Sequence, residues 1–190
     1  LFAAGRDRWF GLPHFESLRC MHLADLSQNR ATTSLTPEAR ASARENTILH
    51  YEKALEAFEN QDEQVPIHLL NNLSWYLALE DDEAKVARSL ELAERARDRL
   101  SSRSENPQIY DTYSWALYRN GRVEKARREY EELLAVHEDP GFRFHFARVL
   151  NELGDHRRAL AELEKALDFP SFADRQKAIL LRAQIQAALR

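Results

Sequence analysis

PQIYDTYSWALYRNGRVEKARREYEELL, residues 107–134, and PGFRFHFARVLNELGDHRRALAELEKAL, residues 140–167, are the two stretches that decide the fold of this chain. They register on one another at a shift of 33 positions, which pairs Gly121 with Gly154 and Ala126 with Ala159. Between these anchors, large apolar residues recur every three or four positions, the spacing that gathers them on one face of a helix. The sequence therefore predicts an internal repeat, which governs the architecture of the whole chain.

Each stretch predicts a helix, a turn and a second helix. Asn106 and Asp139 each precede a proline, so an N-cap side chain stands before a residue suited to the first helical position. Gly121 and Gly154 stand where the first helix has to end, because glycine accepts the left-handed conformation of a C-cap. The side chains predicted to be buried are Tyr110, Tyr113, Leu117, Ala126, Tyr130, Leu133 and Leu134 in one unit, and Phe142, Phe146, Leu150, Ala159, Leu163, Ala166 and Leu167 in the next.

A third unit precedes these two. Residues 71–78 parallel the first helix at 111–118, with Trp75 opposite Trp115. The expected second helix carries small residues at the close-contact positions, and the acidic turn at 80–83 is longer and lacks glycine. A surface turn tolerates such an insertion at little entropic cost. Those small residues are Ser89, Ala93 and Ala96.

The flanks predict further helices. Thr36 and Pro37 mark a helix start, and an apolar face then runs to about Glu59. Residues 15–26 would be its partner in a degenerate first repeat, joined by a polar loop at 27–35. Residues 173–189 predict a helix that covers the last apolar face, as repeat arrays require. The apolar face of the long N-terminal helix is Ile48, Tyr51, Ala54, Leu55 and Phe58, and that of the closing helix includes Ile179, Leu180, Leu181, Ala183, Ile185 and Leu189.

This pattern resembles the tetratricopeptide repeat (TPR) family, whose unit is a helix pair of about 34 residues. The resemblance implies an all-α fold, a right-handed superhelical array of antiparallel helix pairs (an α-solenoid) with about three clear repeats plus flanking helices. It divides the chain into N-terminal helices at 1–65, repeats at 66–105, 106–139 and 140–172, and a closing helix at 173–190. The family's usual tryptophan early in the first helix is Leu70, Tyr110 and Arg143 here, and its usual mid-helix glycine is Ser74, Ser114 and Ala147. Arg143 is the one departure that predicts a local change in packing.

No catalytic constellation is found in the sequence. The seven histidines include no two that lie three to five residues apart, and no phosphate-binding glycine motif occurs. His14 and His22 could share a helix face but are more simply exposed side chains. Cys20 is the single cysteine, so several-thiolate zinc sites and internal disulfides are excluded, and a small buried residue is the simpler interpretation than a reactive thiol. We therefore expect no enzyme activity, metal or cofactor within these residues.

The composition and charge of the chain limit the classes of partner that it is expected to bind. The chain has 27 Lys and Arg against 31 Asp and Glu, for a net charge of −4, which argues against a nucleic-acid-binding surface. No apolar run is long enough to insert in a membrane. The densest basic cluster, at 122–128, is interleaved with acidic residues, and the pairs Glu131-Glu132 and Glu162-Glu164 are interpreted as solvated helix surface. The sequence starts at Leu1 rather than Met, which predicts a fragment of a longer protein, and its arginine- and alanine-rich composition suggests a bacterial source.

The resemblance implies a binding groove, because in the TPR family the first helices of successive units line a concave face that holds peptides or partner helices. Asparagine amides pair with peptide backbone, Trp and Tyr supply rigid contact area, and arginine binds carboxylates in a forked geometry. An equally good interpretation is that Trp75 and Trp115 only pack between units. Carried onto this sequence, the concave face comprises Asn71, Asn72, Trp75, Asp111, Thr112, Trp115, Tyr118, Arg119, His145, Arg148 and Asn151.

Two functions follow as expectations. The first is a non-catalytic adaptor or scaffold module that binds a protein or peptide partner. The second is the sensor or regulatory arm of a larger signalling ATPase, protease or transferase whose catalytic domain lies outside this sequence. The residues that grip chaperone C-termini in one TPR subfamily are not matched, so that ligand is not expected. Partner identity and oligomeric state stay open, and so does the compartment, with the cytoplasm favoured over the periplasm.

Overall fold

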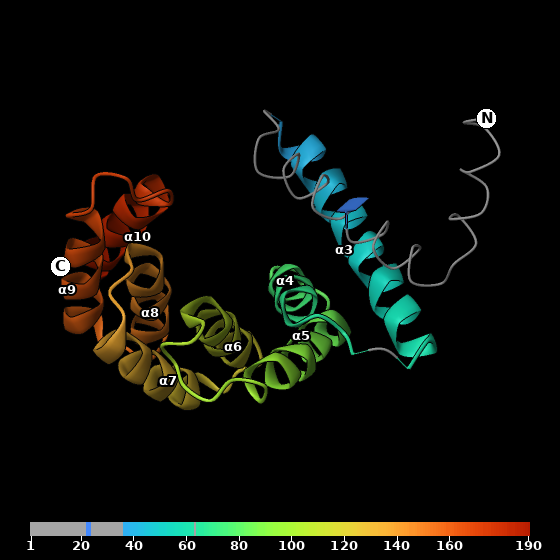
Figure 1. Ribbon diagram of the computed structural model, residues 1–190. Helices are drawn as coiled ribbons and strands as arrows, with labels where there is room; N and C mark the ends of the chain where they lie inside the picture. Colours follow the sequence, from blue (N-terminus) through green and yellow to red (C-terminus); the bar gives the residue numbers. More distant parts are fainter. Residues whose placement is uncertain (1–21, 24–35, 63) are drawn as a thin grey trace. The chain divides into compact units, whose positions relative to one another are not determined.

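The computed structural model describes residues 22–23, 36–62 and 64–190, and every regular element among them is a helix (Figure 1). The chain divides into two compact units, one ending at Ala96 and the other beginning at Arg97. Each unit is described by itself. The predictions for the helix at 15–26, the loop at 27–35, Cys20 and the His14–His22 pair fall wholly or mostly outside the described residues.

The first unit contains α3 (Pro37–Asn60), α4 (Ile67–Ala78) and α5 (Glu83–Arg97), with the last residue of α5 opening the second unit. The predicted start of α3 is confirmed, because the Thr36 Oγ1 accepts a hydrogen bond from the Ala39 amide at 3.2 Å and Pro37 opens the helix. All five residues predicted for its apolar face are buried. The small residues predicted on α5 are also buried, and the Ser74 hydroxyl donates to the Ser89 carbonyl at 2.8 Å. The predicted close approach of α4 and α5 is therefore confirmed at Ser74 and Ser89.

The second unit contains α6 (Pro107–Arg119), α7 (Val123–Val136), α8 (Pro140–Glu152), α9 (His156–Leu167) and α10 (Arg175–Ala188). Each of these helices packs against the next one in the chain, and α6 and α8, which α7 separates in sequence, also touch each other. Of the fourteen side chains predicted to be buried here, Leu134 is the exception, since it is only half-buried. Side chains every three or four residues thus make the predicted interfaces between neighbouring helices.

The helix ends of the second unit follow the repeat with one difference. Asp139 Oδ1 accepts from the Gly141 and Phe142 amides at 2.7 and 3.2 Å, as predicted. Asn106 occupies the equivalent position before α6, but its side chain makes no capping hydrogen bond, so that part of the prediction is wrong. Its backbone φ of −152° and ψ of 87° differ from the extended conformation of Asp139, and the amide side chain is not presented to the helix.

Two glycines close the first helices in the same way. Gly121 and Gly154 have φ of +71° and +77°, and the amides that follow them donate to Leu117 and Leu150 carbonyls at 2.9 Å. This six-to-one bond and the positive φ define a Schellman motif, which the sequence predicted from glycine alone.

Replacing Gly154 by alanine is expected to lower the free energy of unfolding by about 1–2 kcal/mol, because an L-residue resists a positive φ. No atom lies within 4 Å of the added Cβ, so the cost is conformational rather than steric. Urea denaturation followed by circular dichroism measures it. Gly154→Asn, which introduces a residue that adopts positive φ more readily than alanine, is the control, and an equal loss in both variants would contradict this explanation.

Arg143, the departure from the family pattern at which a change in packing was expected, is accommodated in the interior by ion pairs. Its side chain is buried in α8, where one guanidinium nitrogen donates to Glu162 on α9 at 2.5 Å and another to Glu138 at 2.8 Å. The two ion pairs offset the free-energy cost of burying the arginine charge at this position.

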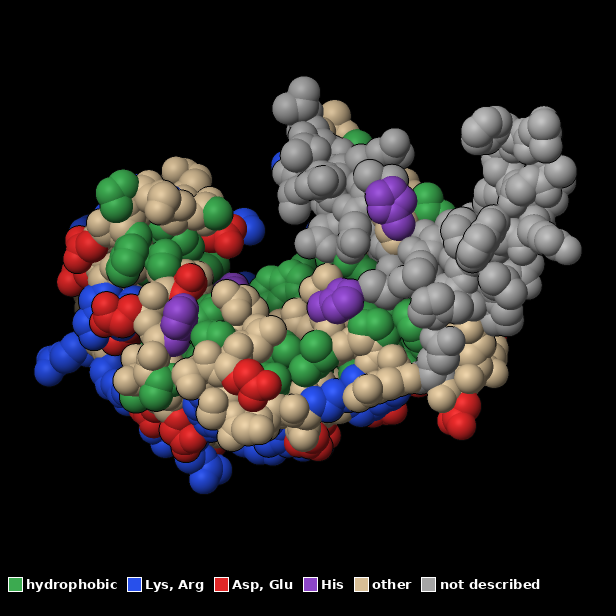
Figure 2. Space-filling view, viewed as in Figure 1, with side chains coloured by type: hydrophobic (Ala, Val, Ile, Leu, Met, Phe, Trp, Pro, Cys, Tyr) green, Lys and Arg blue, Asp and Glu red, His purple; other side chains and the backbone are tan. Residues whose placement is uncertain are grey.

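The closing helix α10 is less buried than expected. Ala178 and Ile185 are its two buried residues, whereas Leu180 and Leu189 are 55% and 56% exposed. Apolar side chains are visible on the surface at this end of the second unit (Figure 2).

Candidate functional site

The first helices of the two pairs in the second unit, α6 and α8, bring eight of the eleven predicted contact residues onto the same unit. The other three lie on α4 in the first unit. Asp111, Thr112 and Trp115 are buried, while the remaining five are half-buried. Those five are Tyr118, Arg119, His145, Arg148 and Asn151.

A buried carboxylate joins three helices of this unit. Asp111 Oδ1 on α6 accepts from the Tyr130 hydroxyl of α7 at 3.0 Å, and it lies 2.9 Å from the His145 Nδ1 of α8. Burial, followed by the neighbouring Asp111 charge, raises the pKa of Tyr130 well above its usual value, so this hydroxyl keeps its proton and donates. The contacts fix Asp111 as an acceptor and hold the imidazole against α6.

An aromatic and cationic stack lies beside this network. Trp115 is 1% exposed, and its ring centroid lies 5.0 Å from that of Tyr118 and 5.1 Å from that of His145. The guanidinium carbon of Arg148 lies 4.7 Å from the centroid of the Trp115 ring. This distance is within the range of a cation–π interaction. Trp115 is thus buried beneath side chains of α6 and α8, as expected if this tryptophan packs between repeats.

The polar surface continues along α8. Residues 145, 148 and 151 lie one turn apart in sequence, so they lie on neighbouring rows of one side of the helix. Asn151 Oδ1 contacts the His156 Nδ1 at 3.0 Å, across the turn into α9. Where α8 meets α6, the buried side chains are therefore apolar and aromatic, and the polar groups lie at the edge of this contact.

On α4 the three predicted residues are all half-buried. Asn71 Nδ2 donates to the Asn72 Oδ1 at 3.2 Å, and Asn72 Nδ2 donates to the Tyr51 hydroxyl of α3 at 3.1 Å. The Asn71 Oδ1 is buried and accepts no hydrogen bond. An unsatisfied buried carbonyl oxygen costs free energy, so this position of the Asn71 side chain is held at the expense of stability.

Sequence reasoning missed the hydroxyls that position these residues. Tyr130 and Tyr51 were predicted as apolar core, yet each hydroxyl bonds a predicted contact residue on the neighbouring helix. The available signal was chemical, because a buried tyrosine needs a partner for its hydroxyl.

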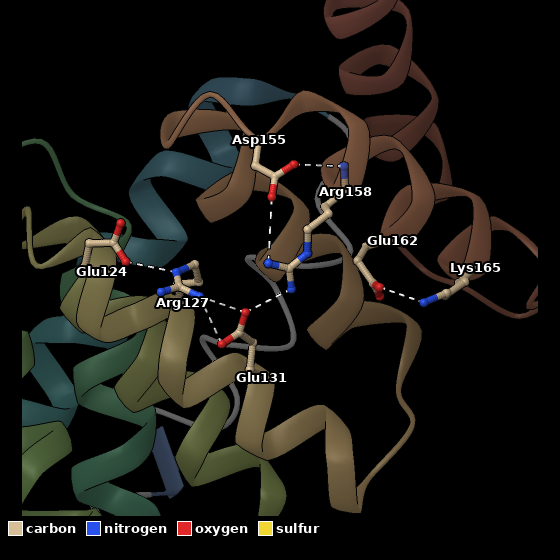
Figure 3. Close-up of polar contacts among 7 residues, drawn as sticks. All are labelled: Glu124, Arg127, Glu131, Asp155, Arg158, Glu162 and Lys165. Atoms are coloured by element: carbon tan, nitrogen blue, oxygen red, sulfur yellow. Dashed lines mark hydrogen bonds and ion pairs between the residues drawn. The ribbon is translucent and has the colours of Figure 1, made fainter.

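The outer side of the second unit carries a network of ion pairs between α7 and α9 (Figure 3). Glu131 accepts from Arg127 on its own helix at 3.0 Å and from Arg158 on α9 at 2.9 Å, while Arg127 also bonds Glu124. Burial alone would raise the pKa of Glu131, but the bonds from Arg158 and Arg127 lower it below its usual value. Acidic and basic side chains lie interspersed along this outer edge (Figure 2), which agrees with the interpretation of solvated, paired helix surface.

Glu162 departs from that interpretation. Its side chain is 14% exposed and bonds both Arg143 and Lys165, so it belongs to the interior edge of the α8–α9 interface.

The first unit also has a cavity of about 410 Å³ between α3 and α5. Its floor is apolar, and Glu52 and Arg88 at its rim form a two-bond ion pair at 3.0 and 3.1 Å. Leu49 at its edge is 48% exposed. The lining comprises Glu45, Ile48, Leu49, Glu52, Leu77, Ala84, Lys85 and Arg88.

Within the described part of the chain, no three His, Cys, Asp or Glu side chains are grouped as metal ligands would be. Nor does any helix of that part combine the length and apolar character needed to cross a bilayer. Compared with known proteins, the chain matches no family model and no curated protein sequence.

Proposed function

We propose that this chain is a non-catalytic protein-interaction module, built as a TPR-like array of helix pairs, which binds an extended peptide or a partner helix along its first helices. In the second unit each helix packs on the next one in chain order, and Gly121 and Gly154 end α6 and α8 at positive φ, which supports the repeat interpretation. The proposed module acts by binding and orienting a protein segment.

The observation that carries this proposal is the α6–α8 face of the second unit. There a buried layer, Asp111 and Trp115, holds an outer layer of groups that recognise peptides: a phenol, an imidazole, a guanidinium and an amide. Such a layer offers large contact area with little loss of side-chain entropy on binding, because its members are already held in place. We propose that Tyr118, Arg119, His145, Arg148 and Asn151 touch the partner, with Asn71, Asn72 and Trp75 doing so on the first unit.

A surface double variant, Tyr118→Ser with Arg148→Ser, is expected to lose the partner that the unaltered chain captures from a native lysate. Its matched control is Arg128→Ser with Arg157→Ser, which removes two exposed arginines of α7 and α9. Circular dichroism checks that all three proteins keep their helix content. Hydrogen exchange of the captured complex is expected to show protection of amides in α6 and α8.

Capture by the double variant at the level of the unaltered chain, or protection confined to α7 and α9, would contradict the proposal. Capture of nothing by any of the three proteins would favour the alternative, in which the array regulates a catalytic domain of a longer protein.

A further inference from the structure

Arg148 differs in its charge environment from the ion-paired arginines of the second unit. Arg103, Arg127, Arg143 and Arg158 each bond at least one carboxylate within 3.0 Å. Arg148 forms no ion pair with any described carboxylate, although it is half-buried on α8. A half-buried guanidinium loses hydration, and the contact with Trp115 supplies no hydrogen-bond acceptor to its N–H groups, so an added carboxylate would be favoured there.

The position of the group is also held. The guanidinium carbon lies over the Trp115 ring, 4.7 Å from its centroid, and that ring is itself packed against Tyr118 and His145. A cation–π contact uses none of the guanidinium N–H groups as hydrogen-bond donors to a carboxylate, so a carboxylate can still accept two parallel hydrogen bonds from them. Arg148 is thus held ready to bind a carboxylate, with less entropy to lose than a free surface arginine has.

The acidic residue of the α6–α8 face does not pair with Arg148. Asp111 is the acidic residue of the α6–α8 face, and its oxygens are engaged by the Tyr130 hydroxyl and by the His145 Nδ1 at 2.9 and 3.2 Å. Its side chain is 11% exposed. Among the described residues, the α6–α8 face therefore supplies no carboxylate for Arg148.

We infer that Arg148, supported by Trp115, is the specificity residue of the proposed surface and selects a peptide segment by an internal Asp or Glu side chain. This inference rests on the proposed function. An internal side chain is favoured over a free C-terminus because polar groups of α8 continue to both sides of Arg148, at His145 and Asn151. A bound peptide that ran along His145, Arg148 and Asn151 would have backbone on both sides of its acidic residue.

The test uses two libraries of 11-residue peptides with blocked ends and random flanks, identical except for Glu or Gln at the central position. The whole chain is expected to retain the Glu library at least about tenfold better than the Gln library, the advantage of a charge-assisted forked pair. Arg148→Gln is expected to lower retention of the Glu library to that of the Gln library. Arg157→Gln, which removes an exposed charge on α9, is expected to keep the preference.

The remaining outcomes overturn one proposal or both. Equal retention of the two libraries by the unaltered chain, or a preference that survives Arg148→Gln, overturns the carboxylate inference and leaves peptide binding in place. A third library with a central Gln and a free C-terminal carboxylate that is retained best would assign the site to chain ends instead. Retention of no library overturns both the inference and the binding of peptides.

Discussion

Replacing Trp115 by alanine is expected to lower the free energy of unfolding by about 3–5 kcal/mol, the range for removing a large buried aromatic side chain. The ring is 1% exposed and supports Tyr118, His145 and Arg148 at centroid distances between 4.7 and 5.1 Å. Alanine would leave a cavity that α6 and α8 close only in part, and the guanidinium would lose the surface on which it lies. Urea denaturation and hydrogen exchange of α6 amides measure the loss.

This result separates the two interpretations of the tryptophans. Trp75 is half-buried on α4, so Trp75→Ala is expected to cost less than Trp115→Ala. If Trp115→Ala kept full stability and lost only partner binding, the packing role would be refuted. Because Trp115 is structural, tests of binding have to use Tyr118 and Arg148 at the surface.

The second large effect concerns the buried ion pair between α8 and α9. Replacing Arg143 by methionine is expected to lower the free energy of unfolding by about 3 kcal/mol, because Glu162 would stay at the interface with only the exposed Lys165 as its counter-charge. Glu162→Leu is expected to cost a similar amount, because it leaves the arginine bonded only to Glu138. The measurement is again chemical denaturation.

The double variant Arg143→Met with Glu162→Leu provides the decisive comparison. An apolar pair of similar volume avoids the desolvation of both charges, so the double variant is expected to be more stable than either single variant. Glu138→Gln is the control, with an expected loss below about 1 kcal/mol since the Glu138 side chain is 72% exposed. Losses in the two single variants that simply add in the double variant would show that the pair is not coupled.

The repeat in the sequence determined much of the local structure. Pro37, Gly121 and Gly154 mark helix ends because their backbone restrictions act within a few residues. The apolar positions every three or four residues predicted which faces are buried, since that periodicity follows from helix geometry alone. Asn106 failed as a cap because a cap also depends on the backbone conformation before the helix, which the preceding loop determines.

The tertiary structure alone decided the roles of the polar residues. Asp111 and Arg148 have the same chemistry in sequence as many exposed side chains, but packing of α6, α7 and α8 gives one a buried network and the other a stacked face. Arg143 likewise is buried at a position where an aromatic was expected, because Glu162, 19 residues away in sequence, pairs with it from the next helix. Helix periodicity is local, whereas the pairing of charges and hydroxyls depends on which helices meet, and only the fold fixes that.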